Sequence, residues 1–492
     1  MENLKENSSH ISDKVFGVGG ILLKLKTKVK RLRNTLFFRV PKKYTKSLIS
    51  KKVVFVEIKK DLSFVRFLSI PIFNKTREYF LITIYREFAE KLGLKVEDTI
   101  DVEIKELVPV QNEEWLINNR INLLAFLPKS FIAVKLTHDN SIIWKIRNGR
   151  GYRPHQIEIT HLVDAELCSY VMGLLLAEGD KKCKAVLRLP NKLLNLHVKF
   201  IEFVKMLGNF KIYSRLCYNP ETLSMKDVEH LKSQYEKYTD LQIKHEVIGK
   251  EIKDYVYISF VNSSILSELI RNVYTTFLNN FSKSISSKEV KIAHMFLLGI
   301  IAGDGSVEVH VRSSHVAQEI TIALESEETC KKVLRMCKNL GYSAYKHKRK
   351  YCVRISLDVF KALQLLSMGI FEGNKNRAKL ICAVAAKRNV FLLRLFKLFR
   401  TFSKKEFSIE DAKRVLQKRD ARDTLLRMIK KGYVFEKDSK YILTDKGFVL
   451  MKTYEEILEE SNRLLKHLKA NSLIDLIKQL KNGKHCEAYP IP

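Results

Sequence analysis

Residues 171–179 read VMGLLLAEG, and residues 297–305 read LLGIIAGDG. Each stretch is apolar except for one carboxylate, which is followed by a glycine. Small residues stand four positions apart in each stretch, and this spacing places them on one face of a helix. They are Gly173 and Ala177 in the first stretch, and Gly299 and Gly303 in the second. Because small residues let two helix backbones approach closely, the two stretches predict a pair of helices packed through these faces.

Glu178 and Asp304 each follow the last small residue of their stretch, so we expect both carboxylates at the same end of the helix pair. Two like charges held close raise each other's pKa unless a cation lies between them. An acid near a helix C-terminus also meets the unfavourable end of the helix dipole. Carboxylate oxygens bind Mg²⁺, which keeps several waters and bridges to phosphate. The alternative is structural: both acids merely end their helices, and Gly179 and Gly305 free the chain to turn into the next strand.

The two stretches open two copies of one αββαββα-like unit, roughly 125 residues apart. In the second copy the helices and strands are expected within 286–305, 307–324, 326–340, 342–357 and 358–368. In the first copy they are expected at 161–179, 184–189, 191–207, 210–218, 241–248, 255–260 and 264–278, with a helical insertion at 224–238. This internal repeat predicts an α+β protein with two pseudo-symmetric units.

Both stretches resemble the LAGLIDADG motif of single-chain homing endonucleases, which carry two such motifs in a pseudo-two-fold fold. The resemblance covers about 225 residues and implies metal-dependent hydrolysis of DNA phosphodiesters, with Mg²⁺ or Mn²⁺ as cofactor. It implies that Glu178, Asp304, Gly179 and Gly303 hold the metal. Departures from the motif are Glu178 in place of the usual Asp, and Leu176 and Ala302 in place of an earlier Asp. The family also uses a lysine after the second hairpin of each unit. Its candidates here are Lys375 and, in the first unit, Lys283.

DNA reading is expected on the exposed faces of the sheets. Strand alternation places Glu308, His310 and Arg312 on one face, with Lys184 and Arg188 on the equivalent face of the first unit. The other candidates in the second unit are Lys346, Lys348 and Arg354. Arginine can read guanine bidentately in the major groove. For any one of these side chains, a phosphate contact or a solvated position is the alternative.

After residue 390 the pattern changes to three helices followed by two short strands. Helices are expected at 390–402, after a cap at 408–411, and at 420–431, with strands at 433–435 and 440–443. This order resembles a winged helix-turn-helix, in which Arg419, Arg422 and Arg427 would lie on the recognition helix. A small helical cap with a hairpin is the alternative.

The charge balance favours a polyanion as partner. Lysine and arginine total 88 against 54 acids, a formal net charge of +34. Such an excess favours nucleic acid, because neutralising phosphates releases counterions. Residues 24–52 carry twelve basic residues and no acid, which predicts either a phosphate-tracking arm or a solvated basic segment. The eight cysteines lack zinc-ligand spacing and are expected to be reduced and free, and no stretch is long and apolar enough to cross a membrane.

The N-terminal residues 1–155 are expected to form a basic mixed α+β domain. Within it, residues 80–104 predict strand, helix and strand, and this single degenerate copy resembles the swapped-hairpin fold of AbrB-type DNA binders. The other expected domains are 156–283 and 284–388 for the two units, 389–470 for the winged helix, and 471–492 as a tail.

We therefore expect a monomeric, intracellular, site-specific endonuclease of double-stranded DNA, cytoplasmic or nucleoid-associated. A splicing intein is not expected, because the chain starts with Met and ends without a His-Asn junction. Two alternatives remain: a DNA-binding regulator that has lost cleavage, and an intron RNA maturase.

Overall fold

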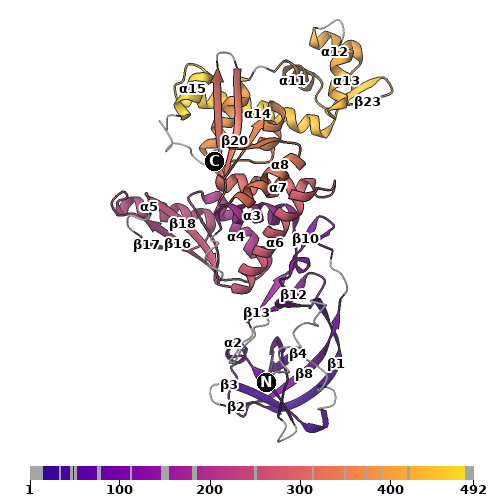
Figure 1. Cartoon of the computed structure of the whole chain (residues 1–492), viewed down its shortest axis with the longest axis vertical. Coiled ribbons are helices and arrows are strands. Elements are labelled where there is room, and N and C mark those ends of the chain that lie inside the picture. Colours follow the sequence, from indigo (N-terminus) through magenta and orange to yellow (C-terminus); the bar gives the residue numbers. More distant parts are fainter. Residues whose placement is uncertain are drawn as a thin grey trace.

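A computed structural model describes most of the chain. The described residues are 15–32, 35–44, 48, 53–74, 79–110, 114–145, 155–179, 185–248, 252–312, 315–347, 351–372, 374–387, 389–417 and 421–481. The chain runs from an end built mainly of strands, through a middle part of helices and sheets, to an end built mainly of helices (Figure 1). Among the described residues, no helix has the length and apolar character needed to cross a bilayer. The mixture of helices and strands confirms the α+β class.

The described residues of the N-terminal part form mainly β-sheets, together with the short helix α2. A seven-stranded sheet has the order β13-β12-β11-β1-β8-β4-β5, and two smaller sheets have the orders β2-β3-β7-β6 and β14-β10-β9. The strands are β1 (Val15–Lys28), β2 (Lys30–Leu32), β3 (Thr35–Val40), β4 (Val54–Lys60), β5 (Ser63–Ser69), β6 (Ile72–Asn74), β7 (Tyr79–Ile84), β8 (Thr99–Pro109), β9 (Leu116–Ile117), β10 (Arg120–Asn122), β11 (Phe131–Lys135), β12 (Asn140–Lys145), β13 (His155–Thr160) and β14 (Leu162–Asp164). The helices are η3 (Lys42–Tyr44), α2 (Arg86–Lys91) and η4 (Leu123–Phe126).

The order strand, helix, strand within 80–104 is confirmed by β7, α2 and β8. The basic stretch that begins at Lys24 is not an arm in its described part, because it forms the end of β1 and all of β2 and β3. Its lysines are partly neutralised there, since Lys24 pairs with Glu103 at 2.9 Å and Lys30 with Glu97 at 2.6 Å.

The first motif unit follows β14. Its helices are α3 (Ala165–Glu178), α4 (Leu194–Leu207), α5 (Met225–Thr239) and α6 (Ser264–Lys283), and its strands are β15 (Leu187–Asn191), β16 (Ile212–Tyr218), β17 (Lys244–Val247) and β18 (Tyr255–Val261). The helix expected from residue 161 begins only at Ala165. Residues 162–164 pair with β10, and the Asp164 carboxylate then caps the helix by accepting from the N–H of Leu167 at 2.8 Å.

The second motif unit has nearly the same order. Its helices are α7 (Val290–Asp304), α8 (Glu327–Asn339), α9 (Val359–Ser367) and α10 (Lys375–Ala386), and its strands are β19 (Gly305–Arg312), β20 (His315–Ala323), β21 (Ser343–Lys346) and β22 (Cys352–Leu357). The sheet order β20-β22-β21 repeats the order β15-β18-β16 of the first unit. The first sheet adds β17, which follows the insertion α5 and pairs parallel to β16.

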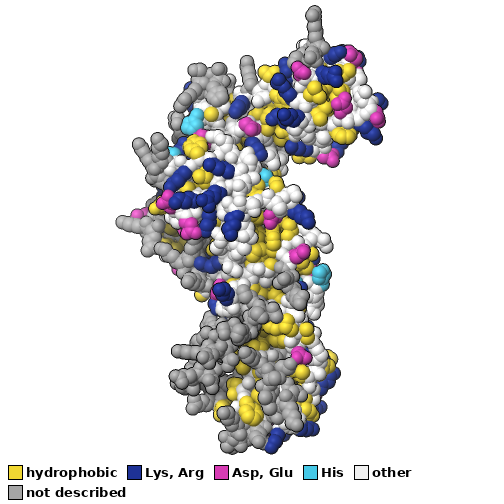
Figure 2. All heavy atoms as spheres, turned by 45° about the vertical axis from the view of Figure 1, so that its right-hand side comes forward, with side chains coloured by type: hydrophobic (Ala, Val, Ile, Leu, Met, Phe, Trp, Pro, Cys, Tyr) yellow, Lys and Arg dark blue, Asp and Glu magenta, His cyan; other side chains and the backbone are white. Residues whose placement is uncertain are grey.

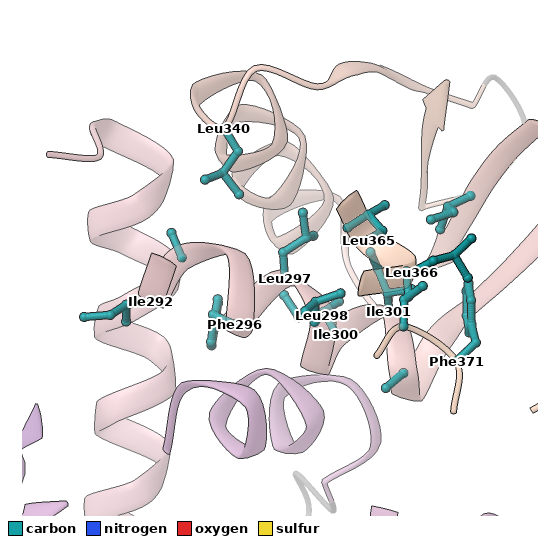
Figure 3. Packing of buried hydrophobic residues seen from close by; sticks show 14 of the residues in the cluster. Ile292, Phe296, Leu297, Leu298, Ile300, Ile301, Leu340, Leu365, Leu366 and Phe371 are labelled. Atoms are coloured by element: carbon teal, nitrogen blue, oxygen red, sulfur yellow. The ribbon is translucent and has the colours of Figure 1, made fainter. Parts of the chain in front are cut away.

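The inner faces of both sheets and the motif helices share one hydrophobic core. Figure 3 shows Leu297 of α7 on the side of Leu340, and Ile301 close to Leu365 and Leu366 of α9. The six described cysteines are buried, and burial raises the pKa of the Cys337 thiol to about 12. Cys183 and Cys486 lie outside the described residues.

The C-terminal part contains the expected helices and hairpin. Its elements are α11 (Val390–Phe402), α12 (Ile409–Leu416), α13 (Arg422–Lys430), β23 (Val434–Lys437), β24 (Lys440–Leu443), α14 (Asp445–His467) and α15 (Leu473–Lys481). The cap expected at 408–411 is confirmed: Ser408 and Asp411 each accept from the backbone N–H of the other. The long helix α14 was not expected.

Candidate functional site

The two motif helices lie in direct backbone contact. A Cβ built on Gly173 would lie 2.0 Å from the carbonyl oxygen of Phe296, and one built on Gly299 would lie 1.9 Å from that of Tyr170. Real Cβ atoms do not approach this closely, so only glycine fits at either position. The expected contact through the small-residue faces is therefore present between α3 and α7.

The helices run parallel, which brings both acids to one end of the pair. Gly173 lies against Phe296 and Ile300, whereas Gly303 lies against Ala177 and Glu178. A Cβ on Gly303 would come within 2.8 Å of Glu178 Cγ. The side chain of Glu178 thus starts beside the residue that precedes Asp304, and both carboxylates are half-buried at the C-terminal ends of their helices.

The glycines after the acids have a different role from the one expected. Gly179 has φ −62° and Gly305 has φ −87°, values that any residue can adopt. What excludes other residues is space: a Cβ would lie 2.3 Å from the carbonyl oxygen of Leu175 at the first position, and 2.3 Å from that of Ile301 at the second. The chain leaves each helix so tightly that only glycine fits.

A buried polar network orients Glu178. Asn191 donates its side-chain N–H to Glu178 Oε1 at 3.0 Å. The backbone carbonyl of Asn191 lies 3.0 Å from Nε2 of His197, whose Nδ1 lies 2.7 Å from the Ser259 hydroxyl. Burial lowers the pKa of His197 to about 4, and the hydrogen bond that its Nε2–H donates to the Asn191 carbonyl partly offsets this shift. The neutral imidazole of His197 therefore fixes Asn191, which in turn orients the Glu178 carboxylate.

A second asparagine secures the chain that follows Asp304. Asn376, which is 7% exposed, accepts from the N–H of Val307 at 3.3 Å and donates to the Gly305 carbonyl at 3.4 Å. Lys375 precedes it and is exposed as the first residue of α10. The hydrogen bonds of Asn376 place this lysine next to the start of β19, beside the acid end of α7. Neither asparagine was recognised from the sequence, because each lies more than ten residues from its carboxylate.

Lys283 lies elsewhere. It ends α6, and Phe281 two residues earlier packs on Phe296 in the first half of α7, with 5.8 Å between ring centroids. Phe296 is eight residues before Asp304, a distance of about 12 Å along a helix. The structure therefore does not bring Lys283 to Glu178 and Asp304.

The exposed face of the second sheet carries a polar network. Glu308 and His310 point to this face, as alternation predicted, and Glu319 on β20 lies opposite Glu308. Arg354 joins them: it lies 3.1 Å from Glu308 Oε2 and 3.5 Å from Glu319 Oε2. Glu319 also accepts from the Tyr345 hydroxyl at 2.8 Å.

Glu308, His310 and Glu319 form a group of possible metal ligands within the described part of the chain. The guanidinium of Arg354 already lies between the two carboxylates, however, and neutralises one of their charges. A cation at this place would have to displace it. The network therefore suits hydrogen bonding to a ligand better than metal binding.

The remaining candidates on the sheets and on α13 differ in their surroundings. Arg188 is half-buried on β15, and Lys346 pairs with Glu327 at 2.9 Å. Arg422 and Arg427 are exposed on α13. Lys184, Lys348 and Arg419 lie outside the described residues, as does the side chain of Arg312.

Basic side chains are widespread on the surface. Figure 2 shows lysine and arginine gathered over the middle and upper parts of the visible face, which Figure 1 assigns to the motif units and the C-terminal helices. Such a surface attracts a polyanion over a distance of about one Debye length, roughly 8–10 Å.

Comparison with known families places the second unit. Residues 291–364 match the model of the LAGLIDADG-like domain. The match starts at the second residue of α7, ends within α9 and includes Gly299, Gly303 and Asp304. The match supports a LAGLIDADG-like domain in the second unit, a type of domain typical of nucleic-acid-binding endonucleases and maturases. Residues 171–179 lie outside the match, and no curated protein matches the chain.

Proposed function

We propose that the chain is a metal-dependent, site-specific DNA endonuclease of the homing type, with residues 156–283 and 284–388 as two pseudo-symmetric units. The observation that carries this proposal is the parallel contact of α3 and α7. It puts Glu178 beside Gly303 and hence both acids at one end of the pair. Two carboxylates at neighbouring helix C-termini favour a bound cation, because both the like charge and the helix dipoles oppose their ionisation.

The donors at this end fit a hard divalent cation. Glu178 and Asp304 provide carboxylate oxygens, and the backbone carbonyls of Gly179 and Gly303 are adjacent oxygen donors. Mg²⁺ or Mn²⁺ prefers such ligands. When bound, the metal would supply Lewis acidity and lower the pKa of a coordinated water for attack on a phosphodiester.

The chain's own residues have positioning roles in this proposal. Asn191 fixes the rotamer of Glu178, and Asn376 fixes the strand that leaves Asp304. Lys375 is the candidate for steadying charge on the scissile phosphate. The target DNA would lie across the two exposed sheet faces. Residues 389–470, proposed as a winged helix, would add contacts from Arg422 and Arg427.

Cleavage of a random-sequence duplex library in Mg²⁺, followed by sequencing of the ends, tests this proposal. Wild type should produce breaks at a defined site. Asp304→Asn and Glu178→Gln should bind duplex DNA as tightly but cleave at background level. Glu459→Gln, which removes an exposed acid of α14, is the matched control and should cleave normally.

Two other results would replace the proposal. Tight, site-specific binding by wild type without cleavage in Mg²⁺ or Mn²⁺ would identify a DNA-binding regulator. Competition in which a folded intron RNA displaces duplex DNA at lower concentration would identify a maturase.

A further inference from the structure

The exposed face of the first sheet differs in chemistry from that of the second. Tyr213 on β16 lies opposite Phe260 on β18, and their rings stack with centroids 5.4 Å apart and an interplanar angle of 18°. Tyr213 is 38% exposed and Phe260 is half-buried. Ser214 and Ser259, the neighbours of these two residues, are buried on the opposite face. The aromatic pair thus stands on the outer side of the sheet rather than in the core.

Cations flank the pair: Lys211 directly precedes β16, and Arg215 lies on that strand. Lys211 Nζ lies 5.2 Å from the centroid of the Tyr213 ring, and Arg215 Cζ lies 5.2 Å from that of the Phe260 ring. Arg188 lies opposite Phe260 on its other side, on β15. Arg215 also pairs with the exposed Glu246 at 3.1 Å. The aromatic pair is therefore bordered by the positive charges of Lys211, Arg215 and Arg188 and by the negative charge of Glu246.

The stacked rings and the flanking cations would bind different parts of a nucleic acid. The cations can bind phosphates of any nucleic acid. An aromatic ring offers its face, and every base can stack on a ring face. In a duplex the base faces are covered by neighbouring base pairs, and only base edges are accessible in the grooves. The second sheet, with Glu308, Glu319 and Arg354, offers hydrogen bonds suited to such edges.

We propose that the Tyr213–Phe260 pair is a stacking site for unpaired bases of a DNA strand, with Lys211, Arg215 and Arg188 binding the adjacent phosphates. The choice of DNA rests on the proposed endonuclease function. The inference adds that the first sheet takes bases that have left the helical stack, whereas the second sheet takes a paired segment. A base would stack on an outer ring face after Lys211 or Arg215 swings aside towards a phosphate.

Fluorescence anisotropy with two single-stranded probes tests this site. One is a thymidine oligomer of about 12 nucleotides, and the other is an abasic strand with the same number of phosphates. Without divalent metal, wild type should bind the thymidine strand about tenfold more tightly or better. Tyr213→Leu and Phe260→Leu should each reduce this preference, and the double variant should abolish it while retaining affinity for the abasic strand.

Tyr238→Leu is the matched control, because Tyr238 is 41% exposed on α5 and makes no ring stack among those described. It should keep the full preference. Equal affinity of wild type for both strands would overturn the stacking site. A uridine RNA oligomer that binds more than tenfold better than the thymidine strand would overturn DNA as its ligand. Asp304→Asn should lose cleavage but keep these single-strand affinities. The stacking site and the nuclease activity can therefore be refuted separately.

Discussion

Replacing Gly299 with alanine should destabilise the protein, although alanine is the better helix former. In an isolated helix the change from glycine to alanine stabilises by about 0.5–1 kcal/mol. At Gly299 the new Cβ would lie 1.9 Å from the carbonyl oxygen of Tyr170 and 2.7 Å from the backbone nitrogen of Leu174. Ordinary van der Waals contact begins at 3.4 Å. The helices must therefore separate by about 1.5 Å, because a backbone carbonyl cannot rotate away as a side chain can.

The expected magnitude follows from the two opposing effects. One extra methyl group in a well-packed core costs about 1–3 kcal/mol, and a clash with backbone belongs at the upper end. Separation of the helices also weakens dispersion contacts along the whole α3–α7 interface. After subtraction of the helix preference, we expect Gly299→Ala to lower the free energy of unfolding by about 2 kcal/mol.

Denaturant unfolding followed by circular dichroism measures this change. Gly20→Ala is the control, because no atom lies within 4 Å of the Cβ position on that strand glycine. It should leave stability nearly unchanged. A Gly299→Ala protein as stable as wild type or more stable would refute the close packing of α3 on α7, and with it the placement of the two acids.

Three further predictions concern the surroundings of the site. Asn191→Asp keeps the oxygen that accepts from the N–H of Leu193 at 2.9 Å but places a carboxylate against Glu178. Because the added like charge should raise the pKa of Glu178, DNA cleavage should begin to rise at a higher pH than in wild type. An unshifted pH profile would contradict the contact between Asn191 and Glu178. His197 should make stability pH-dependent, because its pKa is about 4 in the folded state and 6.5 in the unfolded state. Between these pH values the unfolded state binds more protons than the folded state. The free energy of unfolding should therefore fall by about 3 kcal/mol from pH 6.5 to pH 4. Urea titrations at several pH values measure this fall, which His197→Gln should reduce. Ser408→Ala removes the N-cap of α12 and should lower the melting temperature of the C-terminal part by an amount equivalent to about 1 kcal/mol, and no change in calorimetry would speak against that capping box.

Local sequence patterns identified most elements of the motif units. Alternation placed Glu308 and His310 on the outer face of β19, and a serine followed three residues later by an acid marked the start of α12 at Ser408. These predictions succeed because strand periodicity and helix capping depend on neighbours a few residues away. The spacing of glycines in the two stretches likewise determined which helix faces meet.

Tertiary structure alone decided which residues surround those helix ends. Asn191 reaches Glu178 and Asn376 reaches the chain after Asp304 across separations of 13 and about 70 residues, and no periodicity links such positions. Lys283 is two residues from a phenylalanine that packs on the far half of α7, which local pattern could not show. The stack of Tyr213 on Phe260 depends on strand register, and register is set by the pairing of whole strands rather than by either strand's own residues.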